Sequence, residues 1–298
     1  MFFLMLFQSA ATFRGALSGL NLWLFTIIPS LLPYMIISSY MTESGSFQYL
    51  SRFLSPVTKH LFHLSDSCGY VILLGFLCGY PIGSKLSADL VKKGEITARE
   101  GQILLAFCNN VSPAFLITYL ADQIICLPAL RTLLISIMIL VPLLFGIFIS
   151  RLSSWLFPTT GNPSFHYRQQ ERKEASIDSC IISSFENIFK LGGYIILFSI
   201  LNEFLRLLLI QTPELQYRIC SFLEITSGLT TYTQYSVTNA VRFTECAAFT
   251  AFGGICCLAQ THSMIQGSGL SLRIYFVSKL AIAGITFLLC SFLYHMLY

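Results

Sequence analysis

The sequence predicts an all-α membrane protein made of two inverted repeats of transmembrane helices, with re-entrant hairpins and broken helices. Three observations predict this fold. The 298 residues are 55% hydrophobic and 11% charged, whereas about 25% of the residues of a soluble domain are charged. Glycine, proline and polar residues interrupt apolar segments twice in each half of the chain. Each half also contains an odd number of predicted crossings, which inverts the second half relative to the first.

The interruptions come in the same order in both halves. They fall within 74–85 and 107–113 in the first half, and within 223–231 and 252–257 in the second. A backbone amide left unpaired in hydrocarbon costs several kcal/mol, so a broken helix persists only where it lines an enclosed or watery cavity. Interrupted segments at corresponding positions of two halves indicate the binding site of a transporter near the bilayer midplane.

Continuous spans of about twenty apolar residues are predicted at 20–41, 125–149, 188–210 and 272–297. Pro29 and Pro33 are expected to kink the first. Residues 1–13 are apolar but carry neither a basic leader nor a small-residue cleavage site, so we expect a retained anchor or a short span.

The interrupted segments are too short or too polar for simple spans. Residues 68–78 form about eleven apolar positions, a helix of about 16 Å or half a bilayer core. A hairpin with its tip at Gly79–Pro81 therefore fits better than a crossing. Residues 102–121 are long enough to cross but are broken at 109–113. In the second half we expect a hairpin over 215–240 with its tip near Ser227–Gly228, then a crossing over 244–265 broken at Gly253–Gly254.

Basic residues gather in two loops, around 85–99 and 151–173, and the positive-inside tendency places both loops in the cytoplasm. Three crossings in each half, with the hairpins counted as non-crossing, put both loops on one side; a half of four crossings with no hairpin is the alternative that also does so. The sequence thus divides into an N-terminal helical repeat (1–150), a polar cytoplasmic linker (151–178) and a C-terminal helical repeat (179–298). No basic run interleaved with aromatics predicts nucleic-acid binding. The ten cysteines lack metal-ligand spacing, and neither a Walker motif nor a nucleophile or zinc motif is present. We therefore expect no enzyme activity, no metal and no cofactor.

The first hairpin carries the first group of candidate substrate-binding residues. Lys85 and Asp89 share one helix face just beyond the tip. Lys85 could meet an anionic substrate and Asp89 could titrate during coupling; the alternative is a solvated pair at the cytoplasmic end. The neighbouring candidates are Gly79, Tyr80, Pro81 and Gly83.

Polar residues at the other three interruptions complete the predicted site. Asn109, Asn110 and Ser112 either contact a solute or ion, or restore the hydrogen bonds of the broken backbone. Glu224 is a carboxylate at membrane depth and a second coupling candidate; the alternative is a buried pair with Arg218 or Arg242. Helix N-termini at such breaks favour a polar or anionic solute. The remaining candidates are Thr226, Ser227, Gly228, Gly253, Gly254 and Gln260.

Several blocks of this chain resemble the family of sporulation integral membrane proteins built from nucleoside-recognition Gate repeats. The blocks are residues 79–90, 94–97 and 105–113, with weaker similarity at 22–33, 191–199 and 223–228. The resemblance covers about residues 15–297, with Ser84 where the family is expected to have a small residue such as Ala and Cys108 where Thr is usual.

The resemblance implies a transporter in the outer forespore membrane that moves dipicolinic acid, a small aromatic dicarboxylate, during sporulation. It also implies a fold related to the Gate domains of nucleoside transporters. The expected partners are this anionic solute, the lipid bilayer and any coupling ion. The alternatives are transport of nucleosides or another small polar metabolite, and a non-transporting membrane scaffold.

Overall fold

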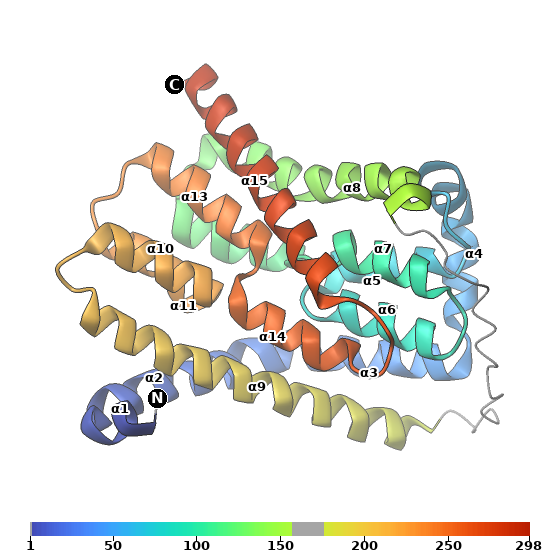
Figure 1. The fold of residues 1–298 in the computed structure, drawn as a ribbon, viewed down its shortest axis with the longest axis horizontal. Coiled ribbons are helices and arrows are strands. Elements are labelled where there is room, and N and C mark those ends of the chain that lie inside the picture. Colours follow the sequence, from blue (N-terminus) through green and yellow to red (C-terminus); the bar gives the residue numbers. More distant parts are fainter. Residues whose placement is uncertain (1, 157–175) are drawn as a thin grey trace.

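The computed structural model describes residues 2–156 and 176–298, and every regular element within them is a helix (Figure 1). The all-α prediction is confirmed. In the first half the helices are α1 (Phe2–Phe7), α2 (Ser9–Leu22), η1 (Trp23–Ile27), α3 (Ile28–Ser44), α4 (Phe47–Val57), η2 (Thr58–Phe62), α5 (Cys68–Cys78), α6 (Ile82–Lys92), α7 (Ala98–Cys108), η3 (Phe115–Ile125), η4 (Pro128–Leu130) and α8 (Arg131–Leu156). In the second they are α9 (Ile177–Leu208), α10 (Pro213–Leu223), α11 (Ile225–Leu229), α12 (Thr231–Gln234), α13 (Asn239–Phe252), α14 (Gly254–Ile265) and α15 (Leu272–Leu297).

Five helical runs in the described residues are long and apolar enough to cross a bilayer: Ser9–Ser44, Pro128–Leu152, Ile177–Leu208, Asn239–Ile265 and Leu272–Leu297. They contain or closely match the four predicted continuous spans, and the Asn239–Ile265 run is the crossing predicted to be broken. The chain is therefore a multi-pass membrane protein.

The first span begins earlier than predicted because α2 packs closely on α9. A Cβ on Gly15 would lie 2.7 Å from the Cα of Ile200, and one on Gly19 would lie 2.7 Å from the Cα of Ile196. Small residues four apart let two membrane helices approach this closely. The run continues through the π-helical turn η1 into α3, just before Pro29.

The predicted interruptions are present in the structure. The chain leaves helical geometry between α5 and α6, at Asn109–Ser112 after α7, and at Gly253 between α13 and α14. Gly253 and Gly254 have φ of +91° and +82°, a conformation that glycine adopts without strain. One predicted position was wrong: the second hairpin breaks at Glu224, and Ser227 and Gly228 lie inside α11. The helix restarts directly after Glu224 because the Glu224 side chain caps it.

The two hairpins reach the middle of the molecule from opposite ends (Figure 1). Helices α5, α6 and α7 lie towards one end, and α10, α11 and α13 towards the other. Arg99, after the α6–α7 turn, and Arg151, near the end of α8, line one hollow, so these two basic residues lie at the same end of the molecule. Within the predicted linker, α8 is helical to Leu156 and α9 begins at Ile177, while 157–175 lies outside the described residues.

Helix α4 crosses the end of the bundle instead of running along it (Figure 1). Phe47 and Ser51 are buried on one face, while Tyr49 and Phe53 are exposed on the other. The loop before α5 is tied to this region through Asp66, which accepts hydrogen bonds from Ser55 and Lys59 that hold the pKa of its carboxyl below the usual value. A helix with these two faces is typical of a membrane–water interface.

Gly83 allows a close backbone contact between the first hairpin and the broken helix. A Cβ at this position would lie 2.5 Å from the Cys108 carbonyl oxygen, at the end of α7. We expect Gly83→Ala to destabilise the protein by about 1–3 kcal/mol, because backbone atoms must move apart. Thermal unfolding of the purified protein in detergent measures this change. The matched control is Gly193→Ala in α9, where nothing lies within 4 Å of the added carbon; equal stability of the two variants would contradict the contact.

Candidate functional site

A cavity of about 460 Å³ lies where the four interruptions meet. Each contributes to its lining: Cys78, Gly79 and Tyr80 from the first hairpin; Val111, Ser112 and Ala114 from the first broken helix; Glu224, Ile225 and Thr226 from the second hairpin; Cys256, Cys257 and Gln260 after the second break. Cavities of about 300–1,000 Å³ hold small-molecule ligands in proteins. Segments far apart in the sequence therefore form one site of ligand size.

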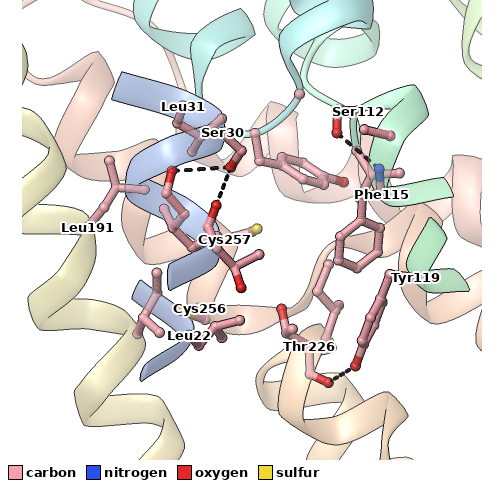
Figure 2. A pocket seen from close by; sticks show the side chains of 18 of the residues that line it. Leu22, Ser30, Leu31, Ser112, Phe115, Tyr119, Leu191, Thr226, Cys256 and Cys257 are labelled. Carbon is pink, nitrogen blue, oxygen red and sulfur yellow. Dashed lines mark hydrogen bonds between the residues drawn. The ribbon is translucent and has the colours of Figure 1, made fainter. Parts of the chain in front are cut away.

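Two further surfaces close the cavity on opposite sides (Figure 2). One is formed by Leu22, Ser30 and Leu31 of the α2–η1–α3 run, next to Leu191 of α9. The other is formed by Phe115 and Tyr119 of η3. Both surfaces include π-helical segments: Thr26 and Ile27 belong to η1, and Phe115 and Tyr119 belong to η3. Such segments occur frequently at functional sites.

Glu224 lines the cavity with a carboxylate that is only 4% exposed. It accepts hydrogen bonds from the backbone amides of Thr226 (2.9 Å) and Ser227 (2.6 Å) and from the Ser227 hydroxyl (2.6 Å). The predicted alternative of an arginine pair is wrong, because Arg218 instead pairs with Glu245 at 2.8 Å and no ion pair joins Glu224 to an arginine in the described residues. The carboxylate therefore satisfies the first amides of α11.

Hydrogen bonds across the cavity join the two halves of the chain. The Tyr119 hydroxyl of η3 donates to the Thr226 carbonyl of α11 (Figure 2). The Tyr80 hydroxyl of the first hairpin donates to the Ala251 carbonyl of α13 at 3.5 Å. A Cβ on Gly253 would approach that same hydroxyl to 2.7 Å, so the second break fits closely against Tyr80. These contacts join the two halves of the chain at the cavity.

Asn109 and Asn110 do not line the cavity. The Asn109 amide nitrogen donates to Thr261 (3.0 Å) and Tyr275 (2.9 Å), and its oxygen accepts from the Ser84 amide. The Asn110 amide nitrogen donates to the Phe107 carbonyl at 2.6 Å. These contacts match the alternative in which the asparagines restore hydrogen bonds around the broken backbone.

Lys85 and Asp89 form an ion pair of 2.8 Å away from the cavity lining. Lys85 is 7% exposed and also donates to the Ser39 hydroxyl of α3 at 3.0 Å. A fully solvated pair is therefore wrong for Lys85. The hydrogen bond from Lys85 to Ser39 joins the first hairpin to α3, and contact with a solute stays a prediction.

The other candidate residues divide into lining and packing positions. Ser112 and Gln260 line the cavity, whereas Pro81, Gly83, Ser227, Gly228, Gly253 and Gly254 do not. Gly228 allows α11 to pack closely against α10, because a Cβ there would lie 2.4 Å from the Ser221 backbone. The Ser227 hydroxyl accepts a hydrogen bond from Asn202 of α9 at 2.8 Å.

Sequence reasoning missed Lys279, which lies in the first third of α15 and is 1% exposed. Its ammonium donates to the Asn109 carbonyl (3.1 Å) and the Asn110 side-chain oxygen (3.2 Å), and lies 5.0 Å from the centre of the Tyr80 ring. A charged residue within an apolar span is by default a functional candidate. That signal was present in the sequence at 272–297.

The cavity lining is mostly apolar and carries little charge. Among the described residues no lysine, arginine or histidine lines it, and Glu224 is its one ionisable carboxylate. Hydroxyl and amide groups supply the other polar contacts: Thr26, Ser30, Tyr80, Ser112, Thr118, Tyr119, Gln123, Thr226 and Gln260. No cluster of metal-binding side chains is found in the described part of the chain.

These features define an all-helical, multi-pass membrane protein whose broken helices meet at a partly open cavity. The chain is 24% identical, over 303 aligned positions, to the sporulation integral membrane protein YlbJ of Bacillus subtilis (strain 168). The alignment covers 91% of this chain and 74% of that protein. No family model matches the chain, and no solved structure matches it. The similarity supports a place among sporulation membrane proteins.

Proposed function

We propose that this protein transports dipicolinic acid across the outer forespore membrane during sporulation. The observation that carries the proposal is the ligand-sized cavity at which all four helix interruptions meet. Broken helices at a central cavity are typical of secondary transporters. The similarity to a sporulation membrane protein supports the biological setting, and the resemblance to the family of sporulation integral membrane proteins supports the solute.

The proposed architecture is a pair of inverted repeats related to Gate domains. Its support is the approach of the hairpins α5–α6 and α10–α11 from opposite ends of the molecule (Figure 1). Broken helices α7–η3 and α13–α14 follow the two hairpins in the same order. In this arrangement alternating access is a movement of one repeat against the other around the shared cavity.

The charge of the cavity favours a second candidate, a nucleoside or another uncharged polar metabolite. The lining offers many hydroxyl and amide groups but no cation to pair with a dicarboxylate, and Glu224 would repel an anion. Hydroxyl and amide groups suit the sugar and base of a nucleoside, and a carboxylate can accept hydrogen bonds from ribose hydroxyls.

Uptake into vesicles that contain only this protein tests both candidates. Radiolabelled dipicolinate and radiolabelled nucleosides are supplied separately, and protein-free vesicles give the background. We expect saturable dipicolinate uptake that excess unlabelled dipicolinate abolishes. Saturable uptake of nucleosides alone would select the second candidate. Uptake of neither solute by correctly inserted protein would contradict both and favour the scaffold.

A further inference from the structure

Lys279 is a buried cation whose partners come from the broken region of another helix and from a hairpin tip. Two oxygen atoms of Asn109 and Asn110 accept its hydrogen bonds, at 3.1 and 3.2 Å, and the Tyr80 ring lies 5.0 Å away. No ion pair joins it to a carboxylate within the described residues. Neutral oxygens and an aromatic face therefore surround an ammonium that is 1% exposed.

The position of the ammonium matches the electrostatics of α7. This helix ends at Cys108, and Asn109 is its C-terminal cap. The carbonyl groups at a helix C-terminus carry partial negative charge, so a cation there is stabilised. In many transporters the unwound carbonyls and the C-terminal ends of half-helices coordinate the coupling cation. At this break the chain provides a cation of its own.

We infer that the Lys279 ammonium is a tethered cation that takes the place of a bound Na⁺ or K⁺ at the broken end of α7. It joins the break to the first hairpin, because Tyr80 contacts both the ammonium and the cavity. Solute movement therefore requires neither metal cation. The part of this inference that concerns movement rests on the proposed function, whereas the structural role of the ammonium does not.

Two measurements on the full chain test the inference. The first is thermal unfolding of the purified protein in detergent, in NaCl, KCl or choline chloride at equal ionic strength. The second is solute uptake into vesicles in the same salts. We expect the wild-type unfolding temperature and uptake rate to be the same in all three salts, since the cation position is already filled. Wild-type uptake that requires Na⁺ or K⁺ would overturn the inference, and this comparison needs no variant.

Variants at position 279 test the charge itself. Lys279→Met keeps the length of the side chain but removes the ammonium, so we expect unfolding at a temperature several degrees lower and uptake reduced at least about tenfold. Lys279→Ala leaves space, and we expect methylammonium chloride, but not choline chloride, to raise its unfolding temperature. The matched control is Ser278→Ala, since the buried Ser278 hydroxyl bonds only the Ile274 carbonyl of its own helix.

The results separate this inference from the proposed function. A Lys279→Met variant as stable and as active as the wild type would overturn the tethered cation. If the wild type moves neither solute, the transport proposal fails, and the unfolding temperatures of Lys279→Met and Lys279→Ala still decide the role of the ammonium.

Discussion

Glu224→Gln should reduce solute uptake at least about tenfold, because two effects act together. Among the described residues Glu224 is the one carboxylate in the cavity lining and a candidate to carry a coupling proton, which the amide of glutamine cannot do. The amide also retains only one oxygen to accept the hydrogen bonds that Thr226 and Ser227 now donate to two carboxylate oxygens. Loss of a hydrogen bond to a charged group costs about 1.5–3 kcal/mol. Because about 1.4 kcal/mol corresponds to a factor of ten, the tenfold reduction is expected where this cost falls on the conformation that moves the solute.

Uptake into vesicles measures this effect, and thermal unfolding in detergent shows whether the variant is folded. The matched control is Glu214→Gln at the start of α10, where the same change removes an exposed carboxylate. We expect this control to behave as the wild type. Normal uptake by Glu224→Gln would exclude a role for the carboxylate in solute movement or coupling.

Ala114→Trp should block the cavity and abolish uptake while leaving the protein folded. Ala114 lies on the cavity lining and is exposed there, directly after the first break. An indole at this position fills space that a solute would occupy, and it replaces no side chain that forms a hydrogen bond in the structure. Uptake measured at equal amounts of inserted protein tests the prediction.

A tryptophan on the outer surface provides the control for Ala114→Trp. Val277 of α15 is 63% exposed, so Val277→Trp adds the same ring to the face that meets lipid. We expect normal uptake from this variant. If Ala114→Trp also transports normally, the solute does not pass through this cavity, and the proposed site is wrong even if the protein is a transporter.

The arrangement of breaks could be predicted from sequence because each has a local chemical cause. Gly79, Pro81 and Gly253 disrupt helices wherever they occur within apolar segments, and the adjacent Asn109 and Asn110 need polar partners at membrane depth. The break at Glu224 was placed too late because it has a different cause. A side-chain cap starts α11 there, and a cap is less evident in sequence than a glycine.

The lining of the cavity could be predicted only in part, because it depends on contacts between distant segments. Thr26, Ser30 and Tyr119 line it, yet Thr26 and Ser30 lie in a predicted continuous span and Tyr119 lies several residues beyond the predicted break at 109–113. Conversely, Lys85 and Asn110 are polar residues near breaks whose side chains bond other protein groups. Spacing along the chain indicates which residues are near a break, but packing decides which of them face the cavity.

The position of α4 across the end of the bundle has a consequence for the distance between the membrane surface and the cavity. A helix with aromatic side chains on its free face is typical of the boundary between water and lipid. The position of α4 therefore indicates where that boundary lies relative to the other helices. From the loop beside it, the eleven residues of α5 rise about 16 Å. This length is about half of a 30 Å hydrocarbon layer. On the proposed function, a solute held beside Gly79 would be about equally distant from both aqueous compartments, so the inward and outward steps of a carrier cycle would cover similar paths.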